Sequence, residues 1–197
     1  MANGMGSVAR ILYKELVRGD LRKLKAESND SDSGGGARDF RFRSFDVLLP
    51  VIQKMFPQSS QEKRRRNGQS VVIDIYKGRF FWRDSGNNVV SKESFFEPPT
   101  SARPGEGRIA KVHEYPCFDA SNVNVGFGNR VLLLLIQLDD GAVWPYYAEE
   151  TTLRTPGVWH PDVARELLDC LDAIRPASQA TLGFRDFTNS GRYCNGR

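Results

Sequence analysis

The 197-residue sequence predicts a mainly β fold, with about seven strands and two to three short helices. Runs of β-branched and aromatic residues recur between Gly, Pro and Asn turns, and several alternate apolar with polar positions. These runs do not alternate with long helices, which disfavours a doubly wound α/β sheet and favours a barrel or sandwich. With 40% hydrophobic residues, a chain of this length can bury a core of its own.

The N-terminal quarter predicts a helix followed by a hairpin. Residues 8–17 (VARILYKELV) carry apolar side chains at helical spacing and contain no proline. Residues 21–26 alternate apolar and basic side chains, residues 27–36 are polar and end in three glycines, and residues 37–45 alternate again. This pattern is typical of a β-hairpin with a long polar tip.

The middle of the chain predicts one helix and a second hairpin. Residues 46–56 (DVLLPVIQKMF) read as a helix in which Pro50 starts a new turn, and residues 61–68 read as a basic loop. Two β-rich runs then pair across a tight turn at Lys77-Gly78, namely residues 70–76 and 79–83.

The last third predicts three more strands and one helix. The strands are residues 109–115, 129–138 and 141–151. Residues 160–174 form the late helix, with Pro161 in its first turn. Periodicity is lost from Pro176 onward, so we expect one domain over residues 1–175 and a tail or interdomain linker over residues 176–197.

Cysteine usage and hydropathy bear on the compartment. Cys117, Cys170 and Cys194 are too few and too widely spaced for a disulfide framework, which predicts free thiols in a reducing compartment such as the cytoplasm. The longest apolar run, residues 131–136, falls far short of the roughly 20 residues of a membrane helix. Membrane spanning and secretion are not expected.

The charge is unevenly distributed along the chain. Residues 1–115 hold 21 Lys and Arg against 14 Asp and Glu, whereas residues 116–197 hold 7 against 10. The whole surplus behind the net charge of +4 therefore lies in the first part. Cations gathered on one face bind polyanions, so nucleic acid is the first partner to consider; an uneven solvated surface is the alternative.

The sequence offers little for catalysis. It contains no phosphate-binding Gly-Lys-Ser/Thr loop, so no nucleotide cofactor is expected. His113 and Cys117 are half of a metal site whose other ligands are missing, and no bound metal is expected. The enzymatic alternative is a complete small Mg²⁺-dependent DNA endonuclease using Asp74 and Lys77, although residues three apart on a strand point to opposite faces.

An RNA-binding or protein-interaction domain is a third possibility. Exposed aromatic side chains would offer a stacking surface for unpaired bases. Alternation along residues 79–83 favours core packing for most of the candidates, which are Phe80, Phe81, Trp82 and Tyr146.

Two polar segments between strand-like runs carry the side chains that proteins use to read DNA bases. These are Arg and Lys for guanine, Asn for adenine, and Asp and Glu for cytosine. Each segment begins and ends on strand-like sequence. The candidates of the first arm are Lys23, Lys25, Ser28, Asn29, Asp30, Arg38, Asp39 and Arg41. Those of the second arm are Arg103, Glu106, Arg108 and Lys111, with Lys92 as a further phosphate contact. A pair of solvated surface loops is the alternative.

At these residues the sequence resembles the N-terminal effector domain of EcoRII-type (type IIE) restriction endonucleases. That domain is a DNA-binding pseudobarrel similar to the DNA-binding domain of plant auxin-response and abscisic-acid-response transcription factors. The similarity covers roughly residues 20–150. The segments that carry it are Lys23-Leu24-Lys25-Ala26, Ser28-Asn29-Asp30, Gly34-Gly35-Gly36, Phe40-Arg41-Phe42, Lys54-Met55-Phe56-Pro57, residues 103–109 (RPGEGRI) and residues 131–140.

The resemblance implies an open seven-stranded pseudobarrel whose two arms grip a short CCWGG-like site in the major groove. It implies a domain that is not catalytic by itself, joined covalently to a nuclease domain in a bacterial restriction-modification enzyme. The sequence departs from the family in residues 89–101, in residues 63–66 (KRRR), and at Arg38, where a histidine-like reader is expected.

For a DNA-binding domain of this kind, each candidate has an expected role. Arg38, Arg103 and Arg108 donate to guanines, and Asp39 and Glu106 accept from cytosine or orient an arginine. The phosphate contacts are Lys23, Lys25, Lys92 and Lys111.

Overall fold

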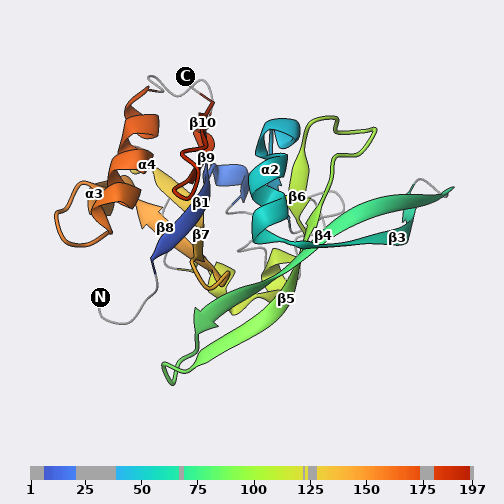
Figure 1. Cartoon of the computed structure of the whole chain (residues 1–197), viewed down its shortest axis with the longest axis horizontal. Coiled ribbons are helices and arrows are strands. Elements are labelled where there is room, and N and C mark those ends of the chain that lie inside the picture. Colours follow the sequence, from blue (N-terminus) through green and yellow to red (C-terminus); the bar gives the residue numbers. More distant parts are fainter. Residues whose placement is uncertain are drawn as a thin grey trace.

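The computed structural model describes residues 7–20, 39–66, 69–121, 123, 128–173 and 180–195. Its architecture is mainly β: ten strands of the described residues form one curled, open sheet, with helices packed against it (Figure 1). This confirms the predicted fold class, although the described residues contain ten strands rather than seven.

The strands follow one another in the sheet in the order β10-β9-β1-β7-β8-β4-β5-β6-β2, and β3 pairs with β4 off this path. All pairings are antiparallel except the contact of β4 with β8 at Phe80 and Val143. The strands are β1 (Val8–Glu15), β2 (Phe40–Phe42), β3 (Gln58–Arg66), β4 (Gln69–Arg83), β5 (Val89–Glu97), β6 (Gly107–Ile109), β7 (Val131–Leu138), β8 (Val143–Glu149), β9 (Leu182–Asp186) and β10 (Arg192–Cys194). The helices are α2 (Phe45–Met55), α3 (Glu150–Leu153) and α4 (Pro161–Ala173), with 3₁₀ turns η1 (Val112–Glu114) and η2 (Pro116–Phe118).

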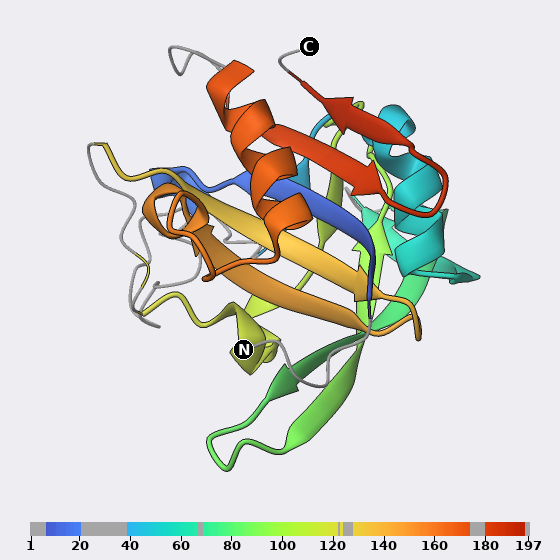
Figure 2. The same ribbon diagram turned by 60° about the vertical axis from the view of Figure 1, so that its left-hand side comes forward.

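Strand β7 separates two hydrophobic cores, and every one of its residues is buried. Leu133 and Leu135 face a core rich in phenylalanine beneath α2, whereas Leu132 and Leu134 face the core beneath α4. Figure 2 shows α4 crossing one face of this part of the sheet. The continuous apolar sequence of the strand, which predicts a buried strand, therefore fills both layers.

The predicted opening helix over residues 8–17 is wrong. This segment is β1, which lies between β7 and β9 and pairs with both. Leu12 belongs to the first core and Ile11 to the second, so the strand is buried on both faces and loses the period-two alternation of a half-exposed strand. A short apolar stretch of this kind matches helical spacing by chance.

Two predicted connections around the basic segment are also wrong. Residues 61–66, expected in a loop, belong to β3, and Lys77-Gly78, expected in a tight turn, lies inside the continuous strand β4. Gly78 is needed there because a Cβ atom would approach the Met55 carbonyl oxygen to 2.9 Å. The hairpin turn comes later, after Arg83, where Asp84 accepts hydrogen bonds from the backbone N–H groups of Gly86 and Asn88.

The two expected helices after residue 40 are confirmed. Helix α2 runs through Pro50, which is exposed, instead of restarting at it. Helix α4 begins at Pro161, as its sequence predicts. The predicted strand over residues 109–115 is wrong beyond Ile109, because residues 112–114 form the 3₁₀ turn η1.

The expected tail after Pro176 is wrong for residues 182–194, which form β9 and β10 at one end of the sheet. A disulfide bond between Cys170 and Cys194 ties β10 to α4. The prediction of free thiols is therefore wrong for these two cysteines, and only Cys117 is free. The prediction failed because residues 24 positions apart in sequence meet only through the sheet.

Among the described residues, no helix is both long enough and apolar enough to cross a membrane.

Candidate functional site

Strands β2, β6 and β5 bring the two predicted arms side by side. Arg41 of β2 lies directly opposite Arg108 of β6, which in turn lies opposite Glu97 of β5. Like charges opposite each other destabilise an antiparallel pair. A carboxylate between the two arginines offsets this repulsion, and Asp39 supplies it.

Asp39 and Glu97 hold Arg108 through three hydrogen bonds. The arginine donates from Nη1 to Asp39 Oδ2 at 3.0 Å, and from Nε and Nη2 to Glu97 Oε2 at 2.9 and 2.6 Å. Both carboxylates are buried, at 2% and 3% exposure. Burial alone lowers the pKa of Arg108, but its bonds to Glu97 and Asp39 outweigh this and raise that pKa. The guanidinium is thus charged and fixed in orientation.

Arg41 shares the same buried carboxylate. Its Nε donates to Asp39 Oδ1 at 3.1 Å and its Nη2 to Asp39 Oδ2 at 3.4 Å. Its Nη1 is buried without a hydrogen bond and lies 3.7 Å from Glu106 Oε2, an oxygen that also has no hydrogen bond. The two atoms therefore form a buried ion pair that is longer than a hydrogen bond.

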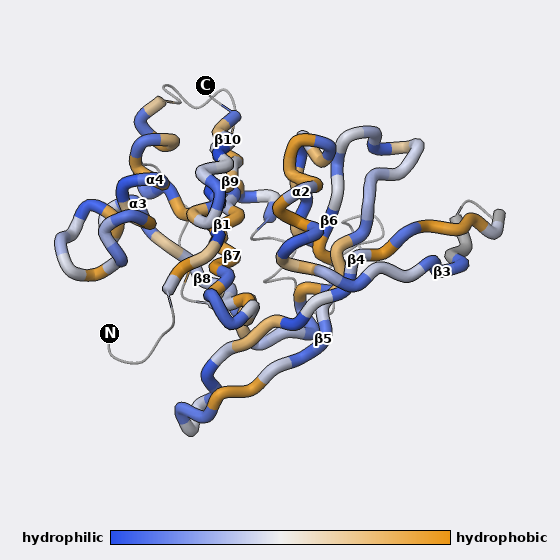
Figure 3. Tube along the Cα trace, in the orientation of Figure 1, coloured by the Kyte–Doolittle hydropathy of each residue, from blue (hydrophilic) through white to orange (hydrophobic). Residues whose placement is uncertain are grey.

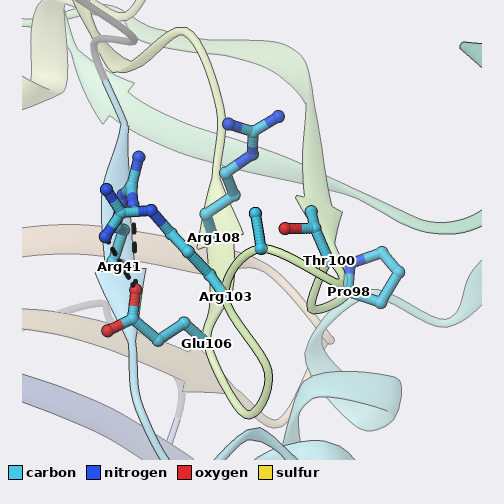
Figure 4. Close-up of a pocket in the computed structure, with 7 residues that line it drawn as sticks. Arg41, Pro98, Thr100, Arg103, Glu106 and Arg108 are labelled. Carbon is cyan, nitrogen blue, oxygen red and sulfur yellow. Dashed lines mark ion pairs between the residues drawn. The ribbon is translucent and has the colours of Figure 1, made fainter. Parts of the chain in front are cut away.

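Glu106 gathers two further arginines at the surface. Arg103 Nη1 lies 3.6 Å from Glu106 Oε2, and Arg43 Nε lies 3.5 Å from Oε1. Figure 4 shows Arg41 and Arg103 turned toward this carboxylate. The side chains of Arg43 and Arg103 are 79% and 58% exposed, so their guanidinium groups are open to a partner. We call these seven residues the arginine cluster: Asp39, Arg41, Arg43, Glu97, Arg103, Glu106 and Arg108.

The loop between β5 and β6 has a defined shape. Its turn is closed by the Arg103 N–H, which donates to the Thr100 carbonyl at 2.9 Å, and by Gly105, whose φ of 78° favours glycine. The Gly105 carbonyl accepts from the Phe45 N–H at 3.0 Å, which ties the loop to the start of α2. At Gly107 a Cβ atom would collide with the Phe45 and Phe96 rings, so this strand packs closely on the core.

A small hollow of about 110 Å³ opens at the cluster. Ligand pockets that hold drug-sized molecules are several times larger, at about 300–1,000 Å³. The hollow is therefore too small to enclose a ligand of nucleotide size. Its lining comes from both arms: Arg41, Pro98, Thr100, Ala102, Arg103, Glu106 and Arg108.

Lys92 and Lys111, both predicted phosphate contacts, meet at a different carboxylate. Their Nζ atoms lie 3.3 and 3.4 Å from the Oε2 and Oε1 atoms of Glu114. The hydrogen bond from Lys92, with help from Lys111, lowers the pKa of Glu114. Lys92 also lies over the Tyr115 ring, 5.0 Å from its centroid.

The structure thus brings together five of the predicted site residues and leaves two in a separate group. Asp39, Arg41, Arg103, Glu106 and Arg108 form one cluster, whereas Lys92 and Lys111 surround Glu114. The other candidates of the first arm lie outside the described residues; they are Lys23, Lys25, Ser28, Asn29, Asp30 and Arg38.

Sequence reasoning missed Arg43 and Glu97. Arg43 continues the basic alternation of Arg41 and could have been included on that ground. Glu97 follows two phenylalanines at the end of β5, and only the pairing of Glu97 with Arg108 shows its role.

The residues of the alternative functions lie elsewhere. Asp74 and Lys77 are three apart on β4, and Lys77 Nζ lies 3.6 Å from Glu62. In the part of the chain that the structure describes, no three His, Cys, Asp or Glu side chains gather as a metal ion would require. Phe80 is fully buried, and Phe81, Trp82 and Tyr146 pack against the two cores.

Comparison of the chain with family models, with curated proteins and with solved structures finds no match. A function for this chain therefore has to be argued from its own residues and their geometry.

Proposed function

We propose that this chain is a sequence-specific double-stranded DNA-binding domain that places the arginine cluster in the major groove. The observation that carries the proposal is the arrangement of four guanidinium groups around three carboxylates, two of them buried, at the meeting point of both arms. Arginine presents a planar fork that matches the O6 and N7 acceptors of guanine, and it reads them best when its orientation is fixed.

Within the cluster the roles divide by exposure. Arg43 and Arg103 are the most exposed arginines and would donate to base edges. Arg41 and Arg108 are held by buried Asp39. They would not contact bases themselves but would keep the electrostatic potential of the site positive. Glu106 would position Arg103, whose Nη1 lies 3.6 Å from Glu106 Oε2.

An uneven solvated surface accounts less well for this arrangement. Surface ion pairs contribute little to stability, with typical values of about 0–1 kcal/mol. Burying two carboxylates beneath arginines is costly unless the geometry is well satisfied, so such an arrangement favours a role in orienting side chains.

The proposal extends to the class of protein. Together with the resemblance of residues 20–150, it makes the chain a recognition domain like the effector domain of EcoRII-type restriction endonucleases. It would bind a short CCWGG-like site, cleave nothing by itself and act with a covalently linked nuclease domain. The roles of the remaining first-arm candidates, Lys23 to Arg38, stay predictions from the sequence, because these residues lie outside the described part of the chain.

Selection of bound duplexes from a random pool, followed by fluorescence anisotropy, tests the proposal. The wild-type protein should bind the selected duplex at least about a thousandfold more tightly than a scrambled one. This ratio is the low end of the range for sequence-specific DNA-binding proteins. R103Q should weaken binding to the selected duplex about 5- to 150-fold, as expected for loss of one base contact, and should change scrambled binding much less. R165Q, which alters an exposed arginine on α4, is the matched control and should have no effect.

Equal affinity of the wild-type protein for selected and scrambled duplexes would refute the proposal. Nicking of a plasmid by this chain in the presence of Mg²⁺ would instead favour the endonuclease that we consider as the alternative.

The proposal also places the protein in the cytoplasm, where bacterial DNA lies. Disulfide bonds are rare in that compartment, so the Cys170–Cys194 bond has to form or persist against a reducing pool. Alkylation of free thiols at lysis, followed by mass spectrometry, should find both cysteines protected. Complete alkylation of the pair would show that the bond is reduced in the cell.

A further inference from the structure

A two-stranded ribbon projects from the sheet near the arginine cluster. Strand β3 pairs with β4 in nine consecutive pairs, from Gln58 with Lys77 to Arg66 with Gln69. In the described part of the chain β3 has no second strand partner, so the ribbon stands away from the body (Figure 1). At roughly 3.3 Å per residue, nine residues reach about 30 Å.

The far end of this ribbon is strongly basic. Lys63, Arg64, Arg65 and Arg66 are consecutive in β3, and Lys63 is exposed. Over residues 58–77 the chain has five Lys or Arg and two Asp or Glu, a net charge of +3. Glu62, which is counted in this sum, has its Oε1 3.6 Å from Lys77 Nζ, nearer the base of the ribbon.

The base of the ribbon adjoins the arginine cluster. The innermost pair of β4 with β5 is Tyr76 with Phe96, directly beside Glu97 of the cluster. In Figure 1 the ribbon and the loop between β5 and β6 both project from the right-hand side of the molecule. A duplex lying on the cluster therefore has the ribbon beside it.

The chemistry of the ribbon fits the DNA backbone better than a second protein surface. The major groove of B-DNA admits a two-stranded β-ribbon, and cations on such an element neutralise phosphates. Figure 3 shows β3 as hydrophilic along the ribbon and the paired part of β4 as more hydrophobic. Four adjacent cations on each copy would repel a second copy of the chain, which disfavours self-association through this end.

We propose that the ribbon end formed by Lys63–Arg66 binds phosphates of the duplex that the arginine cluster reads, outside the recognised base pairs. This proposal rests on the proposed DNA-binding function and adds a third contact element to the two arms. Phosphate contacts carry no direct sequence information. The ribbon therefore sets affinity and salt dependence, while the cluster sets base preference.

The test compares two charge-matched variants in salt titrations. The first is K63Q/R64Q/R65Q/R66Q; the second, R18Q/R154Q/R165Q/R185Q, removes four cations away from the ribbon and the cluster. Each phosphate contact adds about 0.9 to the slope of log Kd against log salt. The slope measured for the ribbon variant should be smaller than that of the wild type by about 2 to 4. Its affinity for the selected and the scrambled duplex should fall by the same factor. The control variant should lose less than about 1.

Trimming the duplex supplies a second readout. On a duplex cut back to the recognised base pairs, the ribbon variant and the wild type should bind with similar affinity, because the flanking phosphates are gone. On a duplex of about 25 base pairs they should differ by tenfold or more at low salt. Circular dichroism and a thermal melt of each variant check that it folds.

The outcomes separate this proposal from the proposed function. A wild type that prefers its selected site, with an unchanged slope in the folded ribbon variant, refutes the ribbon contact alone. A wild type without sequence preference, with a reduced slope in the ribbon variant, supports the ribbon contact and refutes the proposed specificity. A wild type that binds no duplex refutes both.

Discussion

Asp186 joins three elements through one carboxylate, and its replacement by Asn has a predictable effect on stability. Oδ2 accepts from Arg10 Nε of β1 at 3.0 Å and from Lys54 Nζ of α2 at 2.7 Å. Oδ1 accepts from the Thr188 N–H at 3.0 Å and from its hydroxyl at 2.6 Å. The residue is 3% exposed, so water does not substitute for these partners.

The magnitude follows from what an amide can accept. Asn has one oxygen, so in either orientation its NH₂ group faces two donors and at least two hydrogen bonds are lost. Buried hydrogen bonds to charged groups contribute about 1.5–3 kcal/mol each. Because the side chain of Lys54 is 38% exposed, its share is reduced by solvent. We expect D186N to lower the free energy of unfolding by about 2–4 kcal/mol at pH 7.

The pH dependence gives a second signature. Burial alone raises the pKa of Asp186, but hydrogen bonds from Lys54, Thr188 and Arg10 outweigh it and hold this pKa well below its usual value. A carboxylate with a depressed folded-state pKa contributes stability that is present above the unfolded-state pKa of about 3.9 and is lost as pH falls through the folded-state pKa. The difference between wild type and D186N should therefore shrink below about pH 4, by up to about 1.4 kcal/mol per pH unit.

Urea denaturation followed by tryptophan fluorescence, between pH 7 and pH 2.5, measures both effects. The control is D162N, which alters a half-exposed carboxylate paired with exposed Arg165 and should cost less than about 1 kcal/mol at every pH. A loss below 1 kcal/mol in D186N at pH 7, or a difference that stays constant down to pH 2.5, would refute the reasoning.

Three further predictions concern the cysteines and Gly107. C170S/C194S should lower the free energy of unfolding by about 3 kcal/mol in the oxidised protein, because the bond closes a loop with a sequence separation of 24; a loss under 1 kcal/mol in denaturant melts would contradict this, with C117S as the comparison. Burial raises the pKa of the Cys117 thiol to about 12, so the native protein should show no fast-reacting thiol toward a disulfide reagent at pH 8 and one after unfolding; rapid native labelling would contradict it. G107A should cost about 1–3 kcal/mol, since its methyl group meets the Phe45 and Phe96 rings, and an unchanged melting temperature would show that the core accommodates it.

The sequence predicts those strands whose burial pattern is unambiguous. Strand β7 is buried throughout, and its apolar run of eight residues predicts a central strand. Strand β1 is buried on both faces too, but charged residues interrupt it and its apolar positions match a helix. Only the neighbours on each side, β7 and β9, make it a strand.

The basic segment shows a different limit. Lys63–Arg66 has no apolar alternation of its own, because a two-stranded ribbon has no core to face. Its β structure comes from pairing with Val71 and Val72 on β4. The prediction of a loop there followed from composition, whereas the structure follows from a register that the sequence does not display.

The candidate site was predicted in its residue types and only partly in its geometry. Arg103, Glu106 and Arg108 stand out because they flank glycines between strands. Their convergence with Asp39 and Arg41 depends on the pairing of β2 with β6, and the support from Glu97 depends on the pairing of β6 with β5. These are contacts between residues far apart in the chain, which local patterns do not encode.

The ribbon strand β3 also bears on self-association of the protein at high concentration. A nine-residue strand with one partner among the described residues presents backbone N–H and C=O groups along its other edge, and such edges template aggregation. The cations of Lys63–Arg66 oppose this, since two such edges repel each other before they can pair. Neutralising them should make the protein prone to aggregate even at low ionic strength, where the charges of the wild type are not screened, so the charges that we assign to DNA phosphates also protect the free protein.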